Sequence, residues 1–149
     1  MKVIGQDASL PPGTQTVVSV GNFDGIHRGH RTLIRQTIQR ARSQGLSSAV
    51  VTFVPHTRAM LNPDEPPFVL TTCEEKAHLL SGWEVDYLVC LRFDQAMASL
   101  SPEEFLEKIL VDRLGTREWI MGEDHAFGKD RLGTKEFLHK RYGKYDINI

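Results

Sequence analysis

Two kinds of hydrophobic pattern alternate along the chain. Short runs of β-branched and other apolar residues occupy positions 16–21, 48–54 and 85–91. The run at 48–54 is almost continuously apolar, which is typical of a strand covered on both faces in a parallel sheet. Shorter runs at 118–121 and 145–149 predict two further strands.

Between these runs, apolar residues recur at the spacing of one helix face. The first such stretch covers positions 29–43, and a glycine at position 45 marks its end. The residues expected to face the core are Leu33, Ile34, Thr37, Ile38 and Ala41.

Three later helices are also predicted. Segment 71–80 begins with two threonines followed by glutamates, which resembles an N-cap signal. Segment 101–114 begins with Ser101 at the N-cap and Pro102 at the first helical position, and a glycine follows its last residue. A last helix is expected over positions 134–142.

The order of these elements predicts the fold class. Strands that alternate with helices favour a parallel α/β sheet with right-handed crossovers. We therefore expect a Rossmann-like sheet of about five strands with helices on both faces, in a single domain over residues 1–149.

Composition narrows the class of protein. Hydrophobic residues make up 40% of the chain, charged residues 25%, and the formal net charge is −1. This balance is that of a soluble globular protein without the strong positive field of a nucleic-acid binder. No apolar run reaches the roughly 18 residues that a membrane span needs, and positions 1–12 show no signal-peptide core, so the expected location is the cytoplasm.

The two cysteines, Cys73 and Cys90, carry no predicted chemistry. Their spacing matches neither a metal site nor a disulfide framework. In a cytoplasmic protein we expect both to be reduced packing residues.

The stretch 21–30, Gly-Asn-Phe-Asp-Gly-Ile-His-Arg-Gly-His, lies between the first predicted strand and the first predicted helix. Such a junction directs unpaired backbone N–H groups and the positive end of the helix dipole at one point, which suits a phosphate. His27 and His30 can donate hydrogen bonds to phosphate oxygens. Two alternatives are a pair of metal ligands and two histidines that merely lie on the surface.

Three polar clusters follow the carboxyl ends of predicted strands, at positions 21–30, 53–58 and 122–131. Ligands of parallel α/β sheets bind at this edge. The sequence therefore predicts one site to which all three clusters contribute.

The stretch 21–30 resembles the HxGH signature of the nucleotidylyltransferase superfamily, in the form found in bacterial FAD synthetases. Segments 51–56, 70–76, 100–105 and 122–131 resemble successive blocks of the FMN adenylyltransferase module in the same order. HxGH alone indicates the superfamily, whereas the ordered set is specific to the flavin branch. The resemblance covers nearly the whole chain.

This resemblance implies transfer of AMP from ATP to the phosphate of FMN, giving FAD and pyrophosphate with Mg²⁺ assisting. It assigns catalysis to His27 and His30. The ATP pocket would comprise Gly21, Asn22, Phe23, Asp24, His27, Gly29 and His30. The flavin or its phosphate would lie near Phe53, Asp124, Phe127 and Arg131, and Lys129 could meet phosphate charge. No metal held by the protein itself is expected.

Without the resemblance, several of these residues have structural interpretations. Phe53 and Phe127 are aromatic residues of the kind that fill cores, and Asp124 could cap a turn. Arg131 could belong to a solvated loop, and His56 beside a proline could be structural.

The chain departs from the family pattern in three ways. Where the family reads Asp-Pro-His-Pro, this chain has Val54 in place of the acid. The second superfamily signature, Ser-Ser-Thr-x-x-Arg, is not found, nor is a riboflavin kinase domain. We therefore expect a nucleotidylyltransferase-like domain that lacks its C-terminal part. A catalytically weak flavin- or nucleotide-binding module, or a related enzyme with another small acceptor, are the alternatives.

Overall fold

The computed structural model describes residues 1–5, 9–57, 61–62, 64–65, 71–122 and 125–145. In this part of the chain, five strands form one sheet in which every neighbouring pair is parallel, in the order β1-β4-β3-β2-β5. The strands are β1 (Lys2–Ile4), β2 (Thr16–Val20), β3 (Ser47–Val54), β4 (Tyr87–Arg92) and β5 (Thr116–Trp119). The predicted parallel α/β class is confirmed.

Helices connect these strands. The α-helices are α1 (Arg28–Gln44), α3 (Cys73–Leu80), α4 (Gln95–Ala98), α5 (Pro102–Glu104) and α6 (Lys135–Tyr145). Short 3₁₀ turns are η1 (Asp24–Ile26), η2 (Ser81–Trp83) and η4 (Lys129–Arg131), and α5 continues as a π-helix, η3 (Phe105–Arg113). Among the described residues, no helix has the length and apolar character that a membrane crossing requires.

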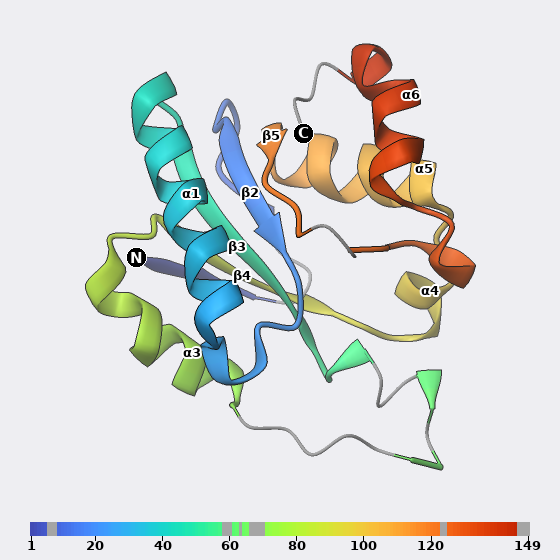
Figure 1. Ribbon diagram of the computed structural model, residues 1–149, viewed down its shortest axis with the longest axis horizontal. Helices are drawn as coiled ribbons and strands as arrows, with labels where there is room; N and C mark the ends of the chain where they lie inside the picture. Colours follow the sequence, from blue (N-terminus) through green and yellow to red (C-terminus); the bar gives the residue numbers. More distant parts are fainter. Residues whose placement is uncertain (6–8, 58–60, 63, 66–70, 123–124, 146–149) are drawn as a thin grey trace.

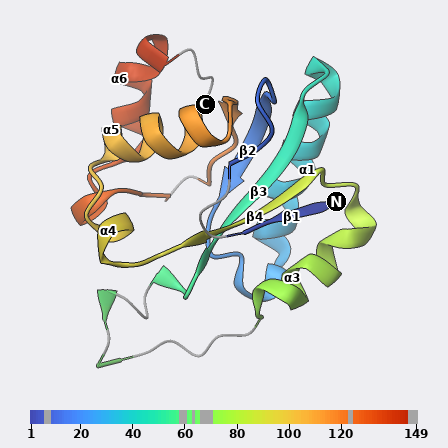
Figure 2. The same cartoon turned by 180° about the vertical axis from the view of Figure 1, so that it is seen from behind.

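The helices cover both faces of the sheet, as predicted (Figures 1 and 2). On one face, α1 and α3 pack on β3 and β4, and Ile34, Leu80 and Val50 belong to their shared core cluster. On the other face, η3 and α6 pack on the sheet through a larger cluster that includes Leu110 and Leu138. Alternate residues along each strand point to opposite faces, so one strand contributes to both clusters.

The edges of the sheet differ from the prediction. The expected strand at 145–149 is wrong at its first residue, because Tyr145 ends α6, and positions 146–149 lie outside the described residues. The fifth strand is instead β1, which pairs with β4. β1 has three residues and is largely exposed, so it carries no periodic signal that the sequence could reveal.

β5 begins two residues earlier than predicted. Gly115 precedes it with a φ of +59°, and a Cβ on this residue would lie 2.0 Å from the carbonyl oxygen of Thr14. Only glycine fits so close to another backbone, and this contact places the start of the strand at Thr116.

The predicted caps are present. Thr72 forms a capping box with Glu75 at the start of α3, and Ser101 forms one with Glu104 at the start of α5. Helix α1 ends at Gln44 with Gly45 as its C-cap, as predicted. These boundaries follow from local side-chain to backbone hydrogen bonds, which explains why sequence pattern located them.

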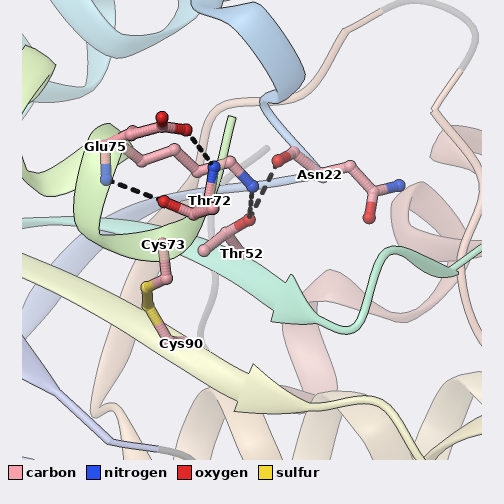
Figure 3. Close-up of a disulfide and its surroundings, with 7 residues drawn as sticks. Asn22, Thr52, Thr72, Cys73, Glu75 and Cys90 are labelled. Atoms are coloured by element: carbon pink, nitrogen blue, oxygen red, sulfur yellow. Dashed lines mark hydrogen bonds between the residues drawn. A yellow bond between two sulfur atoms is a disulfide. The ribbon is translucent and has the colours of Figure 1, made fainter. Parts of the chain in front are cut away.

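The expectation of two reduced cysteines is wrong. Cys73 at the start of α3 and Cys90 in β4 form a disulfide, with Cα atoms 6.9 Å apart (Figure 3). The two residues lie together because α3 packs over β4. The separation of the two cysteines in the sequence does not predict this packing.

Candidate active site

A cavity of about 610 Å³ lies at the carboxyl edge of the sheet. It is lined by residues that follow β2, β3 and β5 and by the first turns of α1. The lining residues are Val20, Gly21, Asn22, Phe23, Asp24, His27, His30, Leu33, Phe53, His56, Thr57, Gly122, His125, Ala126 and Arg131. The predicted convergence of three polar clusters on one edge is confirmed.

The loop after β2 is held in an unusual backbone conformation. Phe23 is buried and has a φ of 48°, and Ile26 is also buried with a φ of 45°. Non-glycine residues rarely adopt these values, and each typically costs about 1–3 kcal/mol. Such strained backbone concentrates at binding and catalytic sites, and here it lies at the wall of the cavity.

Asn22 connects this loop to the segment that follows β3. Its side-chain amide donates to Thr57 Oγ1 at 2.9 Å, and the Thr57 backbone N–H donates to Asn22 Oδ1 at 3.1 Å. The Asn22 carbonyl accepts a hydrogen bond from Thr52 Oγ1 at 2.9 Å. The side chain of Asn22 is therefore engaged within the protein, and its contribution to the cavity is chiefly structural.

Asp24 is fastened to the segment before α3. The backbone N–H of Thr71 donates to Asp24 Oδ1 at 2.8 Å, and Thr71 Oγ1 donates to the same oxygen at 3.2 Å. Thr71 Oγ1 also accepts from the N–H of Gly25 at 3.1 Å. These bonds hold the carboxylate at one position beside the cavity.

His27 and His30 stack on each other at the start of α1. Their ring centroids lie 3.5 Å apart with an interplanar angle of 25°, and His30 makes an edge contact with Phe23 at 5.2 Å. His27 is the exposed N-cap residue, and His30 is half-buried in the first turn. Both rings line the cavity beside the helix N-terminus, where backbone N–H groups favour anions.

Gly29 is placed beside the ring of His27 and is not one of the lining residues. A Cβ at position 29 would lie 3.2 Å from His27 Cε1. The glycine therefore leaves room for the imidazole, whereas the family resemblance assigned it to the ATP pocket itself.

Burial lowers the pKa of His30 from 6.5 to about 4. Electrostatic contributions from His27 and Lys76 are part of this lowering of the pKa, and the Asp24 carboxylate opposes them. His30 is therefore a neutral imidazole at pH 7, and Nδ1 is buried without a hydrogen-bond partner among the described residues. A neutral ring acts through hydrogen bonding rather than through net charge.

A second, smaller cavity of about 200 Å³ adjoins the first. Aromatic and apolar side chains dominate its walls, including Phe53, Phe93, Met97, Phe105 and Phe127. The two cavities share walls at Phe53, Thr57, Ala126 and Arg131.

The predicted flavin residues divide between these cavities. Phe53 and Arg131 line both, and Phe127 lines the smaller one. Phe127 is 8% exposed and its ring contacts Trp119 at 4.8 Å, so it is a core residue as well as a wall. Asp124 lies outside the described residues.

Sequence reasoning missed His125, which lines the larger cavity between Trp119 and Phe127. Burial lowers its pKa to about 4, and the nearby charge of Arg131 acts in the same direction. His125 belongs to the polar cluster at 122–131, so the sequence could place it near the site. Its burial could not be predicted from the sequence.

Val54, the departure from the family pattern, points away from the cavities. It is partly buried against the core cluster beneath α1 and α3. The side chain at this position therefore contributes to packing in this chain.

Fold and site together define a parallel α/β protein with its ligand cavity at the carboxyl edge of the sheet, around a glycine-rich strand-to-helix loop. The chain belongs to the FAD synthetase family, whose model matches residues 11–149.

Curated relatives agree with this assignment. The chain is 41% identical over 122 residues to a bifunctional riboflavin kinase/FMN adenylyltransferase of Pseudomonas fluorescens, covering 82% of this chain and 39% of that protein. The protein of the same description from Escherichia coli strain K12 is 35% identical over 95% of this chain and 45% of its own length. The chain thus spans less than half the length of these relatives.

A solved structure shows a similar fold. A crystal structure described as a macrolide-efflux protein from Streptococcus pneumoniae superposes with a TM-score of 0.78 at 29% identity. The match covers 99% of this chain and 49% of that one.

Proposed function

We propose that this chain is an FMN adenylyltransferase that transfers AMP from ATP to FMN and releases FAD and pyrophosphate. Its family and the names of its relatives support this reaction. The observation that carries the proposal is the pair of adjoining cavities. The larger has polar and apolar walls and lies beside a helix N-terminus, and the smaller is largely aromatic and apolar.

The reaction requires two anions to meet in line. An oxygen of the FMN phosphate attacks the α-phosphorus of ATP and forms the new P–O bond. The bond from that phosphorus to the oxygen bridging to the β-phosphate breaks, and pyrophosphate leaves with the electron pair. A phosphate oxygen is already nucleophilic, so the protein has to align the substrates and stabilise the developing charge.

The larger cavity suits the triphosphate. We assign the ATP site to Gly21, Asn22, Phe23, Asp24, His27 and His30, with both histidines in catalysis. Gly29, which the family resemblance adds to this set, would act indirectly by leaving room for the His27 ring. The N-terminus of α1 and the imidazole N–H groups would stabilise phosphate oxygens in the transition state. Neutral His30 would donate a hydrogen bond without serving as a cation.

The smaller cavity suits the flavin ring. Phe53 and Phe127 offer aromatic surface to a planar ring system. Arg131 is exposed where the two cavities meet, and a guanidinium can bind phosphate with two parallel hydrogen bonds. We retain Asp124 as a flavin-site residue because the family resemblance assigns it.

Mg²⁺ would enter this site with ATP. The described residues contain no group of three or more His, Cys, Asp or Glu side chains that could hold a metal ion, so the ATP phosphates would supply most of its ligands. The ion would neutralise phosphate charge.

The test is incubation of the chain with ATP, FMN and Mg²⁺, with FAD and pyrophosphate measured together. We expect both products in equal amounts. His30→Ala should lower kcat/KM by about a hundredfold to a thousandfold, the typical cost of losing one stabilising donor in a transition state. The matched control is His139→Ala, which removes an exposed histidine of α6 and should leave turnover unchanged.

Calorimetry with ATP, FMN and FAD separates the alternatives. Binding of all three without turnover would replace the proposal with a nucleotide- and flavin-binding module. Turnover of ATP with another small acceptor, unaffected by added FMN, would move the chain to a different branch of the superfamily.

A further inference from the structure

Lys76 on α3 is a buried lysine outside the ATP and flavin residues assigned above. It is 5% exposed, whereas Glu74 and Glu75 beside it are exposed. Lysines are almost never this buried unless their charge is paired. Its position therefore needs a specific interaction.

That interaction is a short relay of hydrogen bonds to the loop at positions 21–27, which follows β2 and is called the ATP loop below. Lys76 Nζ donates to Thr52 Oγ1 at 3.1 Å, and Thr52 Oγ1 donates to the Asn22 carbonyl at 2.9 Å. Figure 3 shows Thr52 on β3 between α3 and Asn22. A hydroxyl has one proton, so its bond to Asn22 leaves a lone pair of Oγ1 as the acceptor for the lysine.

The relay controls the orientation of a peptide in the loop. The carbonyl of Asn22 and the N–H of Phe23 belong to one planar trans unit and point in opposite directions. A fixed carbonyl therefore fixes the direction of the next N–H, in the loop where backbone N–H groups would meet phosphate.

Lys76 also interacts electrostatically with two cavity residues. Burial has the largest effect on the pKa of Lys76 and lowers it. The Asp24 carboxylate raises the same pKa. The lysine charge in turn lowers the pKa of His30, together with burial and His27.

We propose that Lys76 is a positioning residue for adenylyl transfer, which orients the ATP loop through Thr52 and places a positive charge near His30. The inference rests on the proposed function, because the binding of ATP by this loop is itself part of that proposal. A purely structural lysine would instead affect stability alone.

Two variants separate the hydrogen bonds from the charge. Thr52→Val keeps the side-chain shape and the lysine but breaks the relay. Lys76→Met keeps the apolar stem and removes both charge and donor. Lys108→Met, at an exposed position of η3, is the matched control.

The first readout is an NMR titration of His30, which requires no turnover. We expect Lys76→Met to raise the pKa of His30 by about half a unit or more, and Thr52→Val and Lys108→Met to leave it unchanged. If Lys76→Met does not fold, Lys76→Gln serves for the same titration. An unchanged His30 pKa in the folded neutral variant would overturn the electrostatic part of the proposal.

The second readout is substrate-specific kinetics. Thr52→Val should raise KM for ATP about tenfold or more with KM for FMN within about twofold, and calorimetry with ATP should show the same loss. Equal effects on both substrates would mean a general structural role. If the parent chain makes no FAD, the proposed function fails, while the titration and the ATP calorimetry still test Lys76.

Discussion

His30 and His125 are both neutral at pH 7 because burial lowers each pKa to about 4. Nearby basic side chains contribute to the same lowering, His27 and Lys76 in the first case and Arg131 in the second. A buried neutral imidazole supplies one donor and one acceptor nitrogen without the cost of desolvating a cation. A ligand bound in the cavity would therefore meet hydrogen-bonding groups rather than cations at these two positions.

These lowered pKa values predict how stability depends on pH. An unfolded histidine binds its proton near pH 6.5, whereas these folded ones do so only near pH 4. Between these values the unfolded state binds more protons, so the free energy of unfolding should rise as pH increases from about 4 to 6.5, and these groups should add no pH dependence above that. Urea unfolding across this range measures the slope.

The contribution of His125 can be isolated with His125→Phe, which retains an aromatic ring between Trp119 and Phe127. We expect a shallower rise of stability with pH in this variant. The exposed control His139→Phe should keep the parent slope. A parent-like slope in His125→Phe would show that His125 titrates normally in the folded chain.

Residues of the site differ in how far sequence could predict them. His27 and His30 stand out because a glycine-rich strand-to-helix junction is a local pattern. Lys76 does not, because it lies among glutamates at a helix start, as an exposed residue would. Its burial depends on how α3 packs against β3.

At the scale of elements, Gly128 positions the segment that carries Phe127 and Arg131. It has a φ of 74° and a ψ of 177°, a combination that essentially only glycine adopts. A Cβ here would lie 2.7 Å from the backbone nitrogen of Pro102. The backbone at Gly128 therefore packs against the start of α5 with no room for a side chain.

Gly128→Ala should destabilise the fold by about 1–3 kcal/mol, because it adds backbone strain and a clash with Pro102. Urea unfolding gives the change. Gly82→Ala is the control, since a Cβ at position 82 would meet nothing within 4 Å. Equal stability of the two variants would contradict this account of Gly128.

The start of α3 gives a second test at this scale. Thr72 Oγ1 accepts from the N–H of Glu75 at 3.2 Å, and Glu75 Oε2 accepts from the N–H of Thr72 at 2.7 Å. Thr72→Ala should cost about 1 kcal/mol in urea unfolding, the typical value of an N-cap. Thr72→Ser keeps the hydroxyl and should retain most of the stability, so a serine variant as weak as the alanine variant would argue against the cap.

At the scale of the whole molecule, the core beneath η3 supports the edge on which the site lies. Leu110 is fully buried in this cluster with Phe105 and Trp119, and Phe105 also lines the smaller cavity. The same packing that stabilises the sheet thus shapes the cavity proposed for the flavin.

Leu110→Ala should lower the free energy of unfolding by about 2–5 kcal/mol, because it leaves a cavity in a close-packed core. Denaturant titration measures the loss. Leu132→Ala removes the same groups from a side chain that is 63% exposed and should stay within about 0.5 kcal/mol of the parent. Similar losses for both leucines would show that Leu110 is not part of a tightly packed core.

The sequence by itself determined the order of strands β2 to β5 and of helices α1, α3, α5 with η3, and α6, the cap at Ser101, a threonine cap at position 71 or 72, and the histidine loop. The short helix α4 was not among the predicted elements. Periodicity, capping and turn chemistry act within a few residues, so they can be recognised in one segment at a time. Tertiary structure alone decided the edge position of β1, the Cys73–Cys90 pair, the burial of Lys76 and the division of the site into two adjoining cavities. Each of these depends on which faces of distant segments pack together, and no local pattern specifies that.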